Sequence, residues 1–114
     1  MDAARTTQFA HLAAAETGLR TWADTNGVPL VHLEFVVPFS PTNFGVSVWL
    51  FYATDADVQR LDREGLSDGA QKEFLSHLSA AGYPEDWLPE VAFFIDSHEN
   101  VERNFEGNYF YRLR

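Results

Sequence analysis

The chain has 114 residues, of which 46% are hydrophobic and 15% aromatic, which is enough for one packed core and too apolar for a disordered chain. Its 17 acidic residues outnumber the 8 lysines and arginines, and the net charge of −9 argues against binding to nucleic acids or anionic membranes. The sequence has no cysteine, no membrane-spanning apolar run and no signal-peptide pattern, so we expect a single cytoplasmic domain over residues 1–114 without disulfides or a thiolate metal site.

The first half of the chain predicts one long helix followed by a β-hairpin. Apolar residues at helical spacing predict an amphipathic helix over 4–25, which an Asn-Gly pair ends. Residues 30–37 alternate between apolar and polar and predict a half-buried strand. Residues 45–54 are apolar on both sides and predict a central strand. The loop over 38–45 contains two prolines and most simply closes an antiparallel hairpin.

The second half of the chain predicts three helices and two strands. Capping residues and glycine stops bound the helices, and apolar runs mark the strands. In chain order we expect a short helix capped by Thr54 or Asp55 and ended by Gly65, a longer helix capped by Ser67 or Asp68 and ended by Gly82, a strand over 90–96, a helix over 97–105 and a strand over 108–113. The order α-β-β-α-α-β-α-β predicts an α+β fold with helices packed on one face of a four-stranded, mostly antiparallel sheet.

A polar cluster near the C-terminus carries the residues that most resemble a chemical site. Asp96 precedes Glu99 by three residues, the spacing of a capping box, and Ser97 is an alternative cap. His98 and Glu102 would share one helix face, where they could bind a divalent metal together with Asp96 in a small metal-dependent enzyme. The sequence has no H-E-x-x-H, G-x-S-x-G or phosphate-loop motif. We therefore predict a structural role for the cluster, with no catalytic residue, metal or cofactor.

Two surfaces are candidates for protein binding. Carboxylates in the helical middle of the chain would attract a basic partner, although acids paired along a solvated helix face would give the same pattern. Aromatic rings in the proline-stiffened loop would lose little entropy on binding, although they could instead fold back over the sheet. The candidate residues are Asp55, Asp57, Asp62, Glu64, Asp68 and Glu73 on the acidic surface, and Phe39 and Phe44 in the loop.

The C-terminal sequence DSHENVERNFEGNYFYRLR resembles the ending of small bacterial domains, some of which are associated with the immunity proteins of polymorphic toxin systems. The resemblance implies a cytoplasmic protein that binds and neutralises a cognate toxin, and it supplies no catalytic residue. The alternative is a housekeeping or regulatory domain that binds another protein or self-associates. The matching residues are Asp96, Ser97, Glu99, Asn100, Val101, Gly107, Asn108, Tyr109, Phe110 and Tyr111.

Overall fold

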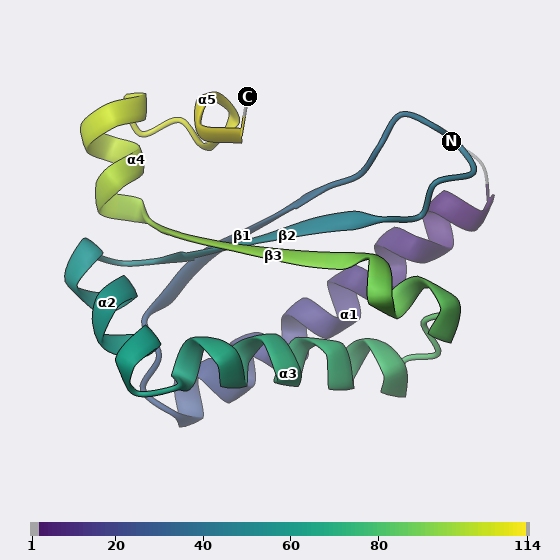
Figure 1. Cartoon of the computed structure of the whole chain (residues 1–114), viewed down its shortest axis with the longest axis horizontal. Coiled ribbons are helices and arrows are strands. Elements are labelled where there is room, and N and C mark those ends of the chain that lie inside the picture. The colour runs from purple at the N-terminus through teal and green to yellow at the C-terminus, as the bar shows by residue number, and fades with distance from the viewer. Residues whose placement is uncertain (1–2, 114) are drawn as a thin grey trace.

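The computed structural model of the chain describes residues 3–113, which form helices around a small β-sheet (Figure 1). In chain order its elements are α1 (Ala3–Thr25), β1 (Leu30–Val36), β2 (Val46–Tyr52), α2 (Asp55–Arg63), α3 (Leu66–Ala80), the 3-10 helix η1 (Glu85–Glu90), β3 (Val91–Ser97), α4 (His98–Phe105) and α5 (Tyr109–Leu113). The α+β class is confirmed, and the elements from α1 to α4 lie close to their predicted positions. Within residues 3–113, no helix has both the length and the apolar character that a bilayer span requires.

The sheet has three strands in the order β1-β2-β3, and its pairing is mixed. β1 and β2 pair antiparallel, as predicted for the hairpin, with Leu33 opposite Leu50. β3 pairs with β2 in parallel, with Phe93 opposite Val48. Parallel neighbours need a crossover connection, and the segment that contains α2 and α3 provides it. The prediction of a four-stranded, mostly antiparallel sheet is therefore wrong.

The aromatic segment predicted as a fourth strand over 108–113 is instead the helix α5. Gly107 adopts a positive φ of 71° and redirects the chain after α4. Tyr109 and Arg112 are three residues apart, so a helix places them on one face, and both contact the sheet. A strand would have turned these two side chains to opposite sides. Their shared contacts with the sheet therefore account for the helix.

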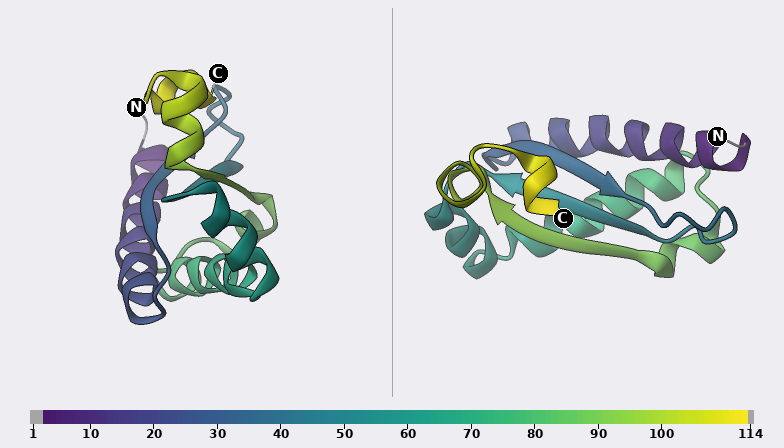
Figure 2. Two further views of the ribbon diagram at one scale, coloured as in Figure 1. Left: turned by 90° about the vertical axis from the view of Figure 1, so that its left-hand side faces the viewer. Right: turned by 90° about the horizontal axis from the view of Figure 1, so that it is seen from above.

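The helices lie on both sides of the sheet, which corrects the prediction that they share one face. Figures 1 and 2 show α1 and α3 beneath the sheet and α4 with α5 above one end of it. The residues of the main hydrophobic core lie between the lower face of the sheet and the two long helices, because apolar residues recur there at the spacing of each element. Its fully buried members include Leu12, Leu19, Val48, Leu50, Phe74 and Leu78.

β2 is the central strand, as the sequence predicts. Leu50, Phe51 and Tyr52 point alternately to the two faces of the sheet, and all three are fully buried. The Tyr52 hydroxyl and Ser67 Oγ form a hydrogen bond of 3.1 Å. Burial raises the pKa of the Tyr52 phenol above its ordinary value. A change in β2 therefore disturbs both layers of the fold.

Replacement of Leu50 should test this dependence on β2. Leu50→Ala should lower the free energy of unfolding by about 2–5 kcal/mol, because a close-packed site cannot fully collapse around the missing atoms. Val31→Ala on β1 is the control: Val31 is 46% exposed, and its truncation should cost less than about 1 kcal/mol. Urea unfolding followed by tryptophan fluorescence measures both values. Equal losses for the two variants would contradict the central role of β2.

Candidate functional site

The face of the sheet that turns away from α1 and α3 is only partly covered, and we call it the open face. It is the upper face of the sheet in Figure 1. Side chains alternate along each strand, so every second residue of β1, β2 and β3 points to it. The strand register groups these residues into rows across the sheet. The first row is His32, Phe51 and Asp96, the second is Glu34, Trp49 and Phe94, and the third is Val36, Ser47 and Ala92.

Tyr109 of α5 covers the first row. Its ring stacks on His32 with 4.0 Å between the ring centroids, and it meets Phe51 edge-on at 4.7 Å. Burial raises the pKa of the Tyr109 phenol, and the negative charges of Glu102 and Glu34 act in the same direction. The phenol is therefore a neutral hydrogen-bonding group that closes this end of the open face.

Arg112 extends the cover from the first row to the second. Its guanidinium lies over the Trp49 ring, 4.7 Å from the ring centroid, and 5.4 Å from the centroid of Phe105. Its Nε donates a hydrogen bond to the Asp96 carboxylate. α5 thus covers the end of the open face near α4 and leaves the third row uncovered.

The three residues considered as a metal site do not converge. Asp96 accepts hydrogen bonds from Arg112 and Asn100 on the open face. His98 instead contacts Glu102 through Nε2 at 2.8 Å and the Tyr109 hydroxyl through Nδ1. Among the described residues, no group of three or more histidines and acids is placed to hold a metal ion. The contacts of His98 join α4 to α5.

The start of α4 is capped differently from the capping box in our prediction. Ser97 Oγ accepts the backbone N–H of Asn100 at 2.9 Å, so Ser97, the alternative cap, is confirmed. Asp96 is not the cap, because α4 begins at His98, directly after Ser97. Glu99 reaches instead to α2, where its Oε1 accepts the backbone N–H of Asp55 at 3.0 Å. The predicted capping box between Asp96 and Glu99 is therefore wrong.

The first turns of α2 and α4 meet at the carboxyl ends of the two parallel strands. The Asp55 carboxylate accepts a hydrogen bond from Ser97 Oγ and another from Arg103 Nη2 at 2.8 Å. The hydroxyl of Ser97, followed by Arg103, lowers the pKa of Asp55. With Glu99 on the N-terminus of α2, acids of the chain itself occupy this junction.

The six acids predicted as a binding surface lie on α2 and α3, and most of them contact a basic group nearby. Exposed pairs of this kind stabilise a helix by only a few tenths of a kcal/mol (about 0.3–0.5). The contacts are Asp55–Arg103, Asp57–Arg60, Glu64–Arg60, Asp68–Lys72 and Glu73–His77, and Asp62 is exposed. The solvated helix face with local pairs that the sequence left open as the alternative describes four of these six acids (Asp57, Glu64, Asp68 and Glu73), because Asp55 pairs with Arg103 of α4.

The two aromatic rings of the β1–β2 loop (residues 37–45) lie in different environments. Phe39 is fully exposed to solvent at the tip of the loop. Phe44 folds back and stacks on Trp87 of η1, with 4.1 Å between the ring centroids and 6° between the ring planes. One ring is therefore available for contact, and the other fastens the loop.

Two buried polar side chains of α1 hold this loop in place. Arg5 is 6% exposed and Gln8 is fully buried, although both are polar. Gln8 Nε2 donates to the Phe44 carbonyl oxygen at 2.9 Å. Arg5 Nη2 donates to the carbonyl oxygens of Pro38, Ser40 and Asn43 at 3.3, 3.0 and 2.9 Å. Because a charged donor satisfies several backbone carbonyls, the tip is fixed before any partner arrives.

The two surfaces predicted from the sequence are not brought together. Figure 1 shows α2 at one end of the molecule and the β1–β2 loop at the other. The longest principal extent of the molecule is 39 Å. The open face lies between them, so a contact that begins at the Phe39 tip reaches the open face before it reaches the acids of α2.

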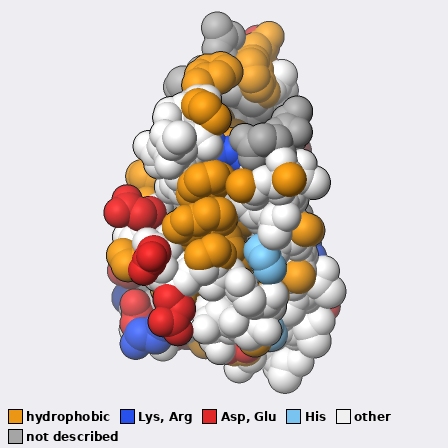
Figure 3. Space-filling model, turned by 90° about the vertical axis from the view of Figure 1, so that its right-hand side faces the viewer, with side chains coloured by type: hydrophobic (Ala, Val, Ile, Leu, Met, Phe, Trp, Pro, Cys, Tyr) orange, Lys and Arg blue, Asp and Glu red, His pale blue; other side chains and the backbone are white. Residues whose placement is uncertain are grey.

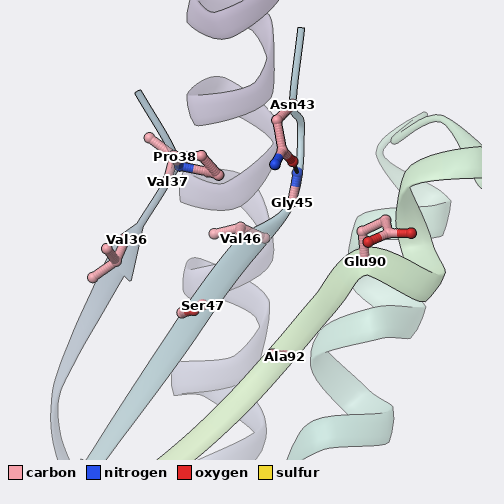
Figure 4. Close-up of a pocket in the computed structure, with 9 residues that line it drawn as sticks. All are labelled: Val36, Val37, Pro38, Asn43, Gly45, Val46, Ser47, Glu90 and Ala92. Atoms are coloured by element: carbon pink, nitrogen blue, oxygen red, sulfur yellow. Dashed lines mark hydrogen bonds between the residues drawn. The ribbon is translucent and has the colours of Figure 1, made fainter. Parts of the chain in front are cut away.

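The third row of the open face borders a hollow of about 370 Å³. Val36, Ser47 and Ala92 form part of its lining (Figure 4). Asn43 of the loop and Glu90, just before β3, stand at its sides in the same view. Figure 3, which looks onto this end of the molecule, shows a hydrophobic cluster with acidic side chains along one side. The lining of the hollow thus combines the apolar Val36 and Ala92 with polar side chains and the acid Glu90.

The open face was missed from the sequence, although its signal is present. β2 is apolar at Trp49 and Phe51 as well as on its core side, and β3 is apolar at Phe94. We attributed this pattern to burial on both sides, because a central strand has the same composition. The structure shows Phe94 42% exposed. Comparison of the chain with protein-family models, curated proteins and solved structures found no match, so the resemblance to immunity domains stays a prediction.

Removal of the Arg5 anchor should loosen the loop. Arg5→Ala should lower the stability of the closed loop by about 1.5–3 kcal/mol, because three carbonyl oxygens of the loop lose a charged donor. Faster hydrogen exchange at the backbone amides of residues 39–44 would report the change. Arg20→Ala is the control, because Arg20 makes a surface pair with Glu16 on the same helix. Unchanged exchange in the loop would contradict the anchoring role of Arg5.

The junction between α2 and α4 should make stability depend on pH. The pKa of Asp55 is lowered in the folded chain, so the carboxylate stabilises the fold above its unfolded pKa and loses this effect as the pH falls through the folded value. The stability difference between wild type and Asp55→Asn should therefore be largest near neutral pH and shrink below about pH 4. Urea unfolding at several pH values measures it. A pH-independent difference would contradict the stabilising role of the Asp55 carboxylate. So would a coupling free energy between Asp55→Asn and Arg103→Gln that stays the same in acid.

Proposed function

We propose that the chain is a protein-binding domain of the immunity type, which neutralises a basic toxin domain by covering part of its surface. One observation carries the proposal: exposed apolar side chains gather on and beside the open face. Exposed apolar side chains that gather in one region mark a protein-binding site more often than single scattered ones do. The exposed residues are Val36 at 40%, Phe94 at 42%, Phe110 at 68% and Tyr111 at 44%.

The rigidity of the surface supports the same proposal. Phe94 stacks on Trp49 with 4.9 Å between the ring centroids, and both sit on hydrogen-bonded strands. Phe39 extends the surface from a loop that Arg5 and Gln8 hold in place. Rings that are already fixed lose little conformational freedom when a partner docks.

The charge of the chain supports a basic partner. A net charge of −9 attracts cationic surfaces and accelerates encounter with them at low salt. The toxin identity of the partner rests on the C-terminal resemblance to immunity domains, and it is the part of the proposal that depends on a sequence pattern.

Self-association is the second candidate, because the open face is apolar and the sheet has unpaired edges. The negative charge opposes it, since two copies would bring like charges together. Sedimentation at several protein concentrations separates the two functions: a monomer is expected, and a concentration-dependent dimer would favour the second candidate.

Affinity capture with matched surface variants should test the protein-binding proposal. The tagged wild-type chain should recover a basic protein in equimolar amount from a lysate of its native cell. Phe94→Arg should lower this recovery at least about tenfold, because it places a cation among the exposed apolar side chains of the open face. Gln59→Arg on α2 is the control: it changes the net charge equally at another exposed site and should leave recovery within about twofold. Circular dichroism checks that both variants fold, and Val36→Arg serves if Phe94→Arg does not.

Equal recovery by the Phe94→Arg and Gln59→Arg variants would contradict the open face as the binding surface. Addition of the purified chain should also inhibit the captured partner if the proposed immunity function is correct. If the captured partner keeps its full activity, the protein-binding function would still hold, but neutralisation would be excluded.

A further inference from the structure

The outer edge of β3 has no strand partner among residues 3–113. β3 is the last strand of the order β1-β2-β3, and no strand among residues 3–113 pairs with its outer side. Figure 1 shows β3 at the front of the molecule, and the view from above in Figure 2 shows it along one margin of the sheet. In such a strand, every second residue turns its backbone N–H and C=O away from the sheet. Between its first and last residues, whose N–H groups bond to Leu88 and Asp96, β3 therefore offers backbone donors and acceptors to an added strand.

This edge lacks several of the features that prevent strand addition. Its register with β2 is continuous from Val91 to Ser97, the segment contains no proline, lysine or bulge, and its one charged residue, Asp96, is paired with Arg112 on the open face. β1, at the other edge, has a register shift between Leu30 and His32. A bulge of that kind twists an edge away from incoming strands. The two edges are therefore not equivalent, and β3 is the one suited to accept a strand.

The open face provides contacts for the side chains of an added strand. Phe94 is 42% exposed and Ala92 is exposed, and both lie on the side of β3 that faces upward in Figure 1. A strand beside β3 would place alternate side chains next to these two residues. The hollow at the third row adjoins Ala92 and adds room for a long side chain. Backbone pairing and apolar contact would thus act together.

Charge identifies the added strand as basic. The helix η1, which leads into β3, carries Glu85, Asp86 and Glu90, and all three are exposed. At the other end of the strand, α2 packs against β3 and carries the exposed Asp62 next to the exposed Arg63, so that end is mixed in charge. Arg112, a cation on the open face near β3, is paired with Asp96. Lysines and arginines in an added strand would meet acid at the η1 end, whereas a second copy of this chain would bring further acid.

We propose that the outer edge of β3 binds an extended, lysine- or arginine-rich segment of the partner by strand addition. The proposal rests on the protein-binding function and specifies how the partner is held. The partner strand hydrogen-bonds to β3, covers Phe94 and Ala92, and places its cations near the acids of η1.

A peptide titration of the full chain tests the proposal. The probe is a blocked peptide of about ten residues in which valine alternates with lysine, a pattern that matches one apolar face and the acidic surroundings. Hydrogen exchange of the backbone amides is followed by NMR. The peptide should slow exchange at the β3 amides saturably, and binding should weaken as salt is added. The same peptide with an N-methylated backbone, and one with glutamate in place of lysine, should each bind at least about tenfold more weakly.

Variants at the two edges provide the matched comparison. Ala92→Lys puts a cation on the β3 edge and should weaken peptide binding at least about tenfold. Val31→Lys makes the same change of charge on β1 and should alter binding by less than about twofold. Both sites are exposed, so both variants should fold.

Three results would overturn the proposal. They are the absence of protection at β3, equal binding of the N-methylated peptide, and protection at β3 in the peptide-free chain that increases with protein concentration, which would identify a second copy as the occupant. These failures remain distinct from failure of the protein-binding function. If a captured partner were lost with Phe94→Arg while the β3 amides stayed unprotected, only the strand-addition proposal would fail.

Discussion

The parallel pairing of β2 with β3 is the constraint on which the rest of the structure depends. Parallel neighbours cannot be joined by a tight turn, so the chain makes a crossover through α2 and α3 beneath the sheet. The crossover covers one face and leaves the other without a long helix. It also brings the carboxyl ends of both strands together, where α2 and α4 begin. There, Asp55 and Glu99 bind across the junction between helices that lie far apart in the sequence.

The open face is consequently divided into a closed end and an accessible end. Tyr109 and Arg112 cover the first row and part of the second, because they lie on the same side of α5. The third row, by contrast, borders Glu90 and the β1–β2 loop, which α1 fixes from the side. The end of the open face near α4 is thus covered by α5, whereas the end near the β1–β2 loop is accessible to a partner.

The sequence predicted most elements correctly because their signals are local. The spacing of apolar residues in α1, the alternation in β1 and the capping residues of α2 each require only neighbouring positions. The parallel pairing of β3 depends on contacts between distant segments, and so does the destination of Glu99. In α5, a run of aromatic residues suits a strand, and only the contacts of Tyr109 and Arg112 with the sheet favour a helix. For the candidate site, Phe39 was named from the sequence, but the open face was not. The sequence pattern of an apolar strand residue is the same whether that residue is exposed or buried.

The order of strands also affects how the chain folds. The β1–β2 hairpin is local and can form early, whereas β3 must wait for the crossover helices before it can dock. Until then β2, with the sequence VSVWLFY, is itself an unpaired edge. It is apolar, uncharged and free of proline and glycine, which is the composition of segments that stack into aggregates. Partly folded chains are therefore most exposed to self-assembly at the strand that is best protected once folding is complete.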